Sequence, residues 1–108
     1  MLKGTKDLDR YEAGAAIFRT GDEGDYMYVV TEGEVDIIMR GETLRTLGPG
    51  GLFGEMSMID GSPRSADAVA RTDCTLAPID ERRFLFLVHE TPMFALEVMS
   101  IMADRLRE

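Results

Sequence analysis

Alternation of hydrophobic and polar residues predicts β-strands through the first three quarters of the chain. The two clearest cover residues 26–31 and 34–40, which are rich in β-branched and aromatic residues, and in the second of them apolar residues alternate with polar ones apart from Ile38. Shorter runs of the same kind predict further strands over residues 15–19, 43–47, 66–71 and 75–79. Eight or so short strands separated by glycine turns favour a mainly β fold with flanking helices, an antiparallel β-roll of the jelly-roll type over about residues 12–80.

Glycine-containing turns predict how these strands pair. Glu32-Gly33 and Gly41-Glu42 separate three consecutive strands, so we expect residues 26–47 to form an antiparallel meander. Residues 72–74 separate two further runs, which we expect to pair as a hairpin. The polar segment 3–12 is expected to form a loop or a single helical turn.

The C-terminal quarter has the hydrophobic period of helices. Asp80 is a typical N-cap for a helix over residues 81–90, and we expect Thr91-Pro92 to cap a second helix over residues 93–107. The second helix carries a narrow apolar seam of Leu96, Met99, Ala103 and Leu106, widened by Val98, Ile101 and Met102. Either all of these residues pack on the roll, or some also meet the same helix of a second chain.

A glycine-rich stretch between the strands carries the candidate chemistry. Residues 48–51 are Gly-Pro-Gly-Gly, which turn the chain, and residues 54–59 are then long enough for one or two helical turns. The first amides of such a helix can bind an anion, and its leading glycine lets a ligand approach the backbone. Arg64 and Ser65 suit phosphate oxygens, whereas the carboxylate of Glu55 suits a neutral donor such as a ribose hydroxyl. The stretch therefore predicts a site for a sugar and a phosphate together, unless Glu55 and Arg64 pair with each other in a corner that binds nothing.

Composition and charge narrow the function classes. The chain has 108 residues, 44% of them hydrophobic, which predicts a single domain over residues 1–108 with its C-terminal helices over about 81–108. Its formal net charge of −8 argues against a nucleic-acid polymer as partner, since such binding needs clustered lysine and arginine. No apolar run approaches the roughly 20 residues of a membrane span. The first residues do not resemble a signal peptide, so we expect a cytoplasmic location and no membrane partner.

Cysteine and histidine offer little for catalysis or metal binding. Cys74 is the one cysteine of the chain, so an intrachain disulfide is excluded and a buried strand thiol is expected. A metal-dependent jelly-roll enzyme is an alternative class, but its site needs several histidines, and this chain has one, His89, on a predicted helix outside the roll. We therefore expect no catalytic residues, no metal, no cofactor and a function that is not enzymatic.

Two motifs carry a family resemblance that covers nearly the whole chain. Residues 53–59, Phe-Gly-Glu-Met-Ser-Met-Ile, and residues 63–66, Pro-Arg-Ser-Ala, resemble the phosphate-binding cassette of the cyclic nucleotide-binding domain family. That family includes bacterial regulators of the catabolite activator type, regulatory subunits of cyclic AMP-dependent kinase and nucleotide-gated channels. Residues 20–33 resemble the family's early hairpin.

The resemblance implies a role for each residue of the cassette. Glu55 would hold the ribose 2'-hydroxyl, and Arg64 and Ser65 would hold the cyclic phosphate together with backbone amides. The implied ligand-binding set is Phe53, Gly54, Glu55, Met56, Ser57, Arg64, Ser65 and Ala66. Because the last helix closes over the base in this family, the candidate cap residues are Met99, Met102 and Arg105. The sequence departs from the family at Ser57, where alanine is most frequent, and at Asp67, which we expect to place an acid near the phosphate.

The resemblance implies a sensor. We expect a stand-alone regulatory module that binds a cyclic nucleotide, cyclic AMP in preference to cyclic GMP because the short chain looks bacterial, and that signals by moving its terminal helices. No output domain follows within this sequence, so we expect a protein partner, a homodimer through the C-terminal helix or sequestration of nucleotide to carry the signal. The alternative is a degenerate family member that keeps the fold and binds proteins without a ligand.

Overall fold

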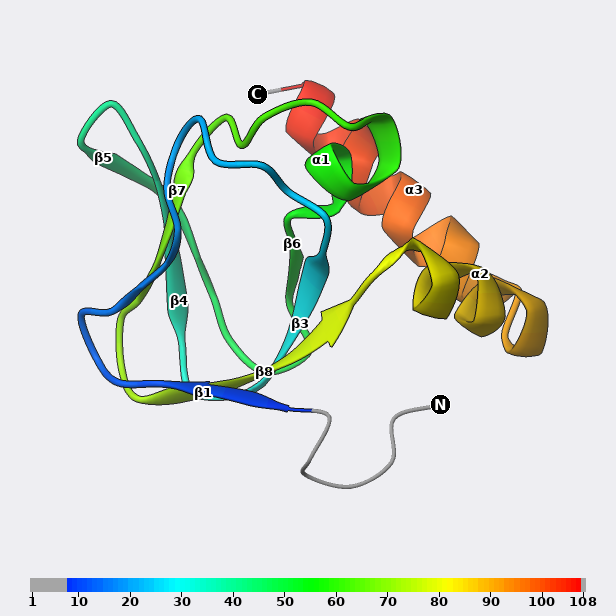
Figure 1. Ribbon diagram of the computed structural model, residues 1–108, viewed down its shortest axis with the longest axis horizontal. Helices are drawn as coiled ribbons and strands as arrows, with labels where there is room; N and C mark the ends of the chain where they lie inside the picture. Colours follow the sequence, from blue (N-terminus) through cyan, green and yellow to red (C-terminus); the bar gives the residue numbers. More distant parts are fainter. Residues whose placement is uncertain (1–7, 108) are drawn as a thin grey trace.

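Two four-stranded antiparallel sheets face each other and form the body of the molecule (Figure 1). The computed structural model describes residues 8–107. One sheet has the order β1 (Asp9–Tyr11), β8 (Cys74–Ile79), β3 (Met27–Glu32), β6 (Leu52–Phe53), and the other has the order β2 (Ala16–Phe18), β7 (Asp67–Ala70), β4 (Val35–Met39), β5 (Glu42–Leu47). This interleaved order is that of a jelly roll, which confirms the expected mainly β roll with flanking helices.

Consecutive strands pair less often than the turn pattern predicts. β4 and β5 form the expected hairpin, with Arg40 and Gly41 at φ of 53° and 80° in its tight turn. β3 and β4 lie in different sheets, and so do β7 and β8, so the predicted meander and the predicted second hairpin are wrong. The chain instead crosses between the sheets at both places. The two crossings meet at Gly33, where a Cβ would collide with the carbonyl oxygen of Asp73, so only glycine fits.

Two short strands lie where the pattern predicts none. Residues 9–11 form β1 alongside β8 instead of the expected loop or helical turn, and residues 3–7 of that prediction lie outside the described residues. Leu52 and Phe53 form β6 alongside β3, and both are buried. Because this strand leads directly into α1 (Glu55–Asp60), the buried pair determines where that helix begins.

Buried side chains form two clusters. The first fills the space between the sheets and includes Val30, Val35, Ile37, Phe53, Ala68 and Leu76. The second contains Met27, Leu52, Met58, Ile79 and Val98, and it joins the roll to the helices. Figure 1 shows α2 (Glu81–Glu90) and α3 (Met93–Leu106) on the outer side of the sheet that contains β3 and β8.

The two C-terminal helices begin differently. The carboxylate of Asp80 accepts a hydrogen bond from the Arg83 amide at 2.8 Å, so the predicted N-cap of α2 is confirmed. α3 begins after Pro92 without a side-chain cap, so the predicted cap by Thr91 is wrong. None of the helices in the described part of the chain is long and apolar enough to cross a membrane.

α3 presents two different apolar faces. The wider set packs on the roll, with Val98 buried and Phe94, Ile101 and Met102 against the second cluster. Three residues of the narrow seam face solvent, since Leu96, Met99 and Leu106 are 55%, 56% and 74% exposed. The arrangement in which every apolar residue packs on the roll is therefore excluded.

Candidate ligand-binding site

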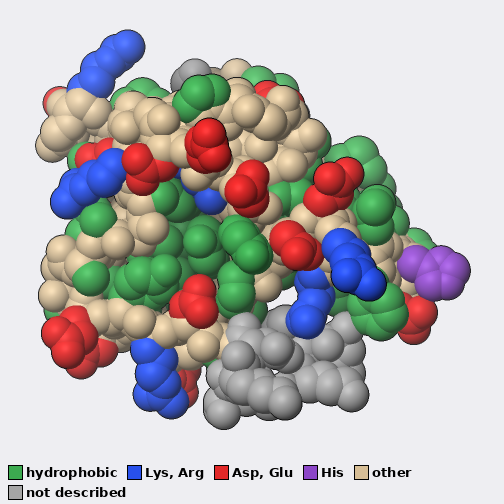
Figure 2. Space-filling model, in the orientation of Figure 1, with side chains coloured by type: hydrophobic (Ala, Val, Ile, Leu, Met, Phe, Trp, Pro, Cys, Tyr) green, Lys and Arg blue, Asp and Glu red, His purple; other side chains and the backbone are tan. Residues whose placement is uncertain are grey.

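A cavity of about 160 Å³ lies between the two sheets, next to α1. It is lined by Phe18, Ile37, Met39, Leu44, Arg45, Phe53, Gly54, Glu55, Met56, Ser57, Arg64, Ser65, Ala66 and Arg105. Hydrophobic side chains are visible in the middle of the roll, and acidic side chains are spread over the same face of the molecule (Figure 2). The fold thus brings residues 53–57 and 64–66, the whole set predicted to bind a ligand, around one cavity.

Arg64 is the buried cation of this cavity, with 5% of its surface exposed. Its terminal nitrogens donate to the carbonyl oxygens of Gly54 at 2.9 Å and Tyr26 at 2.6 Å, and its guanidinium carbon lies 3.9 Å from the centre of the Phe18 ring. Nε has no hydrogen-bond partner, and no carboxylate among residues 8–107 forms an ion pair with this side chain. Burial lowers the pKa of Arg64, because desolvation disfavours the charged form. A buried cation with an unused donor is costly unless an anion fills the site.

Glu55 is also buried, and its partner is Arg105 of α3. One terminal nitrogen of Arg105 donates to both carboxylate oxygens, at 2.9 and 2.7 Å, and the other donates to the Leu52 carbonyl oxygen at 2.9 Å. The pairing of Glu55 with Arg64 that would make an inert corner is therefore not formed. Instead, Arg105 ties the end of α3 to the first residue of α1.

Two glycines let the Arg64 side chain lie against the backbone. Gly54 precedes α1 with φ of 81°, in the left-handed region, and a Cβ there would lie 2.9 Å from a terminal nitrogen of Arg64. At Gly24 a Cβ would lie 2.6 Å from the Arg64 guanidinium carbon and 2.5 Å from the Cβ of Ser57. The sequence gives Gly24 no role at the site beyond its place in the early hairpin of residues 20–33. The structure indicates that it keeps space for the arginine.

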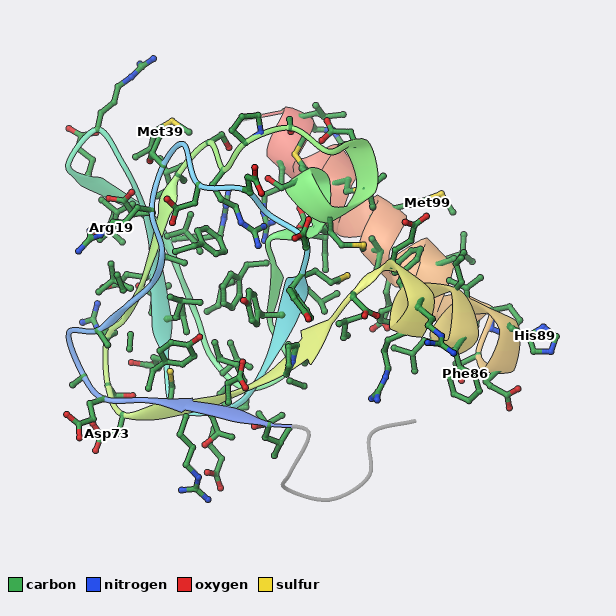
Figure 3. All side chains as sticks on the ribbon, in the orientation of Figure 1. Arg19, Met39, Asp73, Phe86, His89 and Met99 are labelled. Atoms are coloured by element: carbon green, nitrogen blue, oxygen red, sulfur yellow. The ribbon has the colours of Figure 1, made fainter. Side chains whose placement is uncertain are left out.

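The other predicted residues lie at different depths. Ser57 is buried, Met56 is partly buried, and Ser65 is exposed beside Arg64. Met99 and Met102 do not line the cavity: Met99 points away from the roll (Figure 3), and Met102 packs on the second cluster. Arg105 is thus the cap candidate that reaches the cavity, and a capping role for each of the three stays a prediction.

Asp67 does not line the cavity, so the expectation of an acid beside the phosphate site is wrong. Its carboxylate accepts hydrogen bonds from the Thr20 amide at 2.7 Å and the Thr20 hydroxyl at 2.9 Å, and it pairs with Arg19 at 3.4 Å. Hydrogen bonds from Thr20 lower the pKa of Asp67. Ala66 and Ala68 on either side are buried, so the strand alternation places Asp67 on the outer face.

Aromatic rings form one wall of the site. Phe18 and Tyr28 both pack on Phe53, with ring centroids 5.9 and 5.3 Å from it. Burial, with a smaller contribution from Tyr11, raises the pKa of Tyr28 to about 12. The Tyr28 phenol, which stacks on Phe53 and does not itself line the cavity, therefore stays neutral at physiological pH.

Arg45 of β5 also lines the cavity, although sequence reasoning assigns it no role. With Arg64 and Arg105 it gives the lining three cations against one carboxylate, Glu55, in a chain of net charge −8. Local charge of this kind attracts a small anion despite an acidic surface, because distant charges are screened. The missed signal is the strand period: Leu47, two residues on, packs against the first cluster, so residue 45 faces inward as well.

The residues considered for metal binding or redox chemistry lie apart from the cavity. His89 is on the last turn of α2 with its side chain 84% exposed, and it points away from the roll (Figure 3). Within residues 8–107, no three His, Cys, Asp or Glu side chains come together in a way that could hold a metal ion. Cys74 is a buried free thiol, as predicted, and burial raises its pKa.

Comparisons with known proteins give consistent matches. A family model described as the cyclic nucleotide-binding domain matches residues 8–91. A cAMP-dependent protein kinase regulatory subunit from Eremothecium gossypii is 46% identical over 71 residues, which are 66% of this chain and 16% of that protein. A cyclic AMP receptor protein from Thermus thermophilus is 40% identical over 103 residues, covering 91% of this chain and 48% of that protein.

A solved structure of a relative has the same fold as this chain. The crystal structure of the Thermus thermophilus catabolite activator protein superposes with a TM-score of 0.81 at 38% identity, over 95% of this chain and 52% of that one. The chain therefore spans about half, or less, of the length of the relatives it matches.

Proposed function

The chain belongs to the cyclic nucleotide-binding domain family, and we propose that it is a regulatory module that binds a cyclic purine mononucleotide in the cavity next to α1. The observation that carries this proposal is Arg64, a buried guanidinium that has no carboxylate partner within residues 8–107 and whose Nε is unused there. The arrangement suits an anion that enters the cavity from solvent. Relatives named for cyclic AMP support the ligand class.

The cassette offers a place for each polar part of such a ligand. The cyclic phosphate would accept hydrogen bonds from Arg64 and from the hydroxyl of Ser65 at the cavity edge. No side chain caps α1, so the amides that follow Gly54 keep donors for the remaining phosphate oxygens. The ribose 2'-hydroxyl would donate to Glu55, which is an acceptor while ionised.

The ion pair between Glu55 and Arg105 would connect the ligand to α3. Both carboxylate oxygens already bind Arg105, so a hydroxyl that donates to Glu55 joins a network that includes the end of α3. Binding moves α3 only if the ligand has a higher affinity for one position of the helix than for another. We therefore assign Arg105 to signal transmission as well as to the site.

A second copy of the chain is the partner that the exposed seam favours. Leu96, Met99, Ala103 and Leu106 recur at spacings of three, four and three, the period with which two helices pack side by side. Three of them are more than half exposed, which is unusual for a row of large apolar residues without a partner. A homodimer through α3 would bury them.

An inert module that binds proteins without nucleotide is the alternative. The observation that favours it is the pairing of Glu55 with Arg105, which already satisfies the carboxylate. The unused Nε of Arg64 argues against it.

Titration calorimetry distinguishes the nucleotide-binding module from the inert module. Protein purified under denaturing conditions and refolded, so that bound nucleotide is removed, is titrated with cyclic AMP and with cyclic GMP, and the open-chain 5'-AMP serves as the control ligand. Saturable binding of a cyclic nucleotide, with weaker binding of the control, is the expected result. Absence of heat with both cyclic nucleotides would leave the inert module as the better account.

A further inference from the structure

Residues 19–26 connect β2 to β3, and this β2–β3 connection lies against Arg64. It pairs with the arginine backbone on both sides. The Gly21 amide donates to the Arg64 carbonyl oxygen at 2.8 Å, and the Arg64 amide donates to the Asp22 carbonyl oxygen at 2.8 Å. The backbone of the buried arginine is therefore held by a segment about 40 residues earlier in the sequence, not by a neighbouring strand of its own sheet.

The β2–β3 connection also contacts the Arg64 side chain. The Tyr26 carbonyl oxygen accepts a hydrogen bond from a terminal nitrogen at 2.6 Å, and Gly24 leaves the space that the guanidinium occupies. Phe18, the last residue of β2 before the connection, places its ring centre 3.9 Å from the guanidinium carbon. The position of the group proposed to bind phosphate therefore depends on the conformation of this connection.

Asp67 holds the start of the connection. One of its carboxylate oxygens accepts hydrogen bonds from the Thr20 amide at 2.7 Å and the Thr20 hydroxyl at 2.9 Å, and the other lies 3.4 Å from a terminal nitrogen of Arg19. Figure 3 shows Arg19 on the outer side of the sheet that contains β7. Thr20 directly precedes Gly21, whose amide binds the Arg64 carbonyl oxygen, so the contacts of Asp67 and of Arg64 meet at adjacent residues.

We propose that Asp67 is a positioning residue, which orders the β2–β3 connection and so holds Arg64 in the place where it binds the phosphate of the ligand. This inference rests on the proposed function. Asp67 does not line the cavity, and it acts on the arginine through Thr20. A binding group that is already ordered loses less conformational freedom when the ligand binds, and the difference is measured as affinity.

Two substitutions of Asp67 separate its hydrogen bonds from its charge. Asp67→Val suits a strand but has no acceptor for Thr20, and the affinity for a cyclic nucleotide is expected to fall about threefold to tenfold. Asp67→Asn keeps an acceptor oxygen for Thr20 and loses only the exposed ion pair, so its affinity should stay within about twofold of the wild-type value. Asp36→Val is the matched control, because Asp36 accepts a hydrogen bond of 2.6 Å from the Thr46 hydroxyl in the same sheet. It should keep the wild-type affinity.

A double-mutant cycle shows whether Asp67 acts through Arg64. Titration calorimetry with cyclic AMP and with cyclic GMP gives the affinities of the wild-type protein, Asp67→Val, Arg64→Met and the double variant, and thermal melting confirms that each is folded. In the Arg64→Met background, Asp67→Val should cause no further loss of affinity, because the group that it positions is gone. A merely structural role would weaken binding equally in both backgrounds.

Hydrogen exchange in the ligand-free protein tests the ordering itself. The Gly21 and Arg64 amides are expected to exchange about threefold to tenfold faster in Asp67→Val than in the wild-type protein, because the connection opens more often once its bonds to residue 67 are lost. The same two amides should exchange at the wild-type rate in Asp36→Val. Nuclear magnetic resonance measures both rates residue by residue.

Each outcome supports or overturns the inference. Unchanged affinity in a folded Asp67→Val protein overturns it, and so does a loss of equal size with and without the Arg64 side chain, or unchanged exchange of the two amides. Binding by Asp67→Asn that is as weak as that of Asp67→Val also overturns it, because the charge would then matter and not the hydrogen bonds to Thr20. Absence of binding by the wild-type protein is a different failure, since it contradicts the proposed function and the inference with it.

Discussion

One terminal nitrogen of Arg105 donates hydrogen bonds to both carboxylate oxygens of Glu55, at 2.9 and 2.7 Å, across the junction between the last helix and the cassette. The carboxylate side chain is 2% exposed and the guanidinium side chain is 16% exposed. This is a buried ion pair between residues 50 positions apart in sequence. It makes the position of α3 depend on the group expected to bind ribose.

Arg105→Met is expected to lower the free energy of unfolding by about 3 kcal/mol, because it leaves the Glu55 carboxylate buried without its partner. Urea denaturation measures the change. Arg107→Met is the matched control on the same turn, since Arg107 pairs with Asp104 on the surface and its loss should change stability by less than about 0.5 kcal/mol. Similar losses in both variants would mean that the buried pair does not form.

Gly24→Ala is expected to lower the free energy of unfolding by about 1–3 kcal/mol and to weaken nucleotide binding, because its Cβ would overlap the Arg64 guanidinium. Gly48→Ala is the control, since a Cβ there has no neighbour within 4 Å. Denaturation and calorimetry on both variants make the comparison. A Gly24 variant as stable and as active in binding as the control would show that Arg64 occupies another position.

The stability of the domain should fall between about pH 10 and pH 12 through Tyr28. Its pKa in the folded protein is about 12, above the ordinary value of 10.0, because burial disfavours the phenolate. Tyr28 therefore contributes to the free energy of unfolding in full below pH 10. That contribution is lost as the pH rises toward 12, because the unfolded chain releases the phenol proton at a lower pH than the folded protein does. Denaturation at several pH values should show a shallower decline for Tyr28→Phe than for Tyr26→Phe. Equal declines would contradict the assignment to Tyr28.

Met99→Lys should shift the protein from dimer to monomer, because it places a charge in the centre of the exposed seam on α3. Sedimentation velocity gives the mass of both proteins. Leu85→Lys alters an equally exposed leucine on α2 and should leave the dimer intact. A wild-type protein that sediments as a monomer with and without nucleotide would refute the pairing of two copies through α3.

The local sequence pattern predicts where the strands of this fold lie better than it predicts which strands pair with each other. Period-two alternation in residues 34–40 and the turn at Gly41 predict β4, β5 and their hairpin, because everything needed lies within residues 34–47. The same reasoning fails at Gly33 and Asp73, where the chain crosses to the other sheet. A glycine in a tight hairpin turn and a glycine at a close crossing of two chain segments look alike in sequence. Only the segment that lies against the glycine in the fold, here at Asp73, distinguishes the two cases.

The residues of the candidate site show the same difference between what a local motif predicts and what depends on the fold. Glu55, Arg64 and Ser65 are visible in the sequence because they stand in one short motif, and the fold does bring them to one cavity. Asp67 and Arg45 are misjudged, although strand alternation places the first outward and the second inward. The partner of Glu55 cannot be derived from local pattern, since Arg105 reaches it from a helix whose position depends on tertiary packing.

The central claim is that Arg64 binds the phosphate of a cyclic nucleotide, and titration of Arg64→Met beside the wild-type protein tests it most directly. Arg71→Met, which removes a surface arginine paired with Glu34 and Asp36, serves as the control, and thermal melting confirms that each variant is folded. The account predicts saturable binding of a cyclic nucleotide by the wild-type and control proteins, weakened about tenfold to a hundredfold in Arg64→Met through loss of charge-assisted hydrogen bonds. Equal affinity in a folded Arg64→Met protein, or no binding by the wild-type protein, would contradict it.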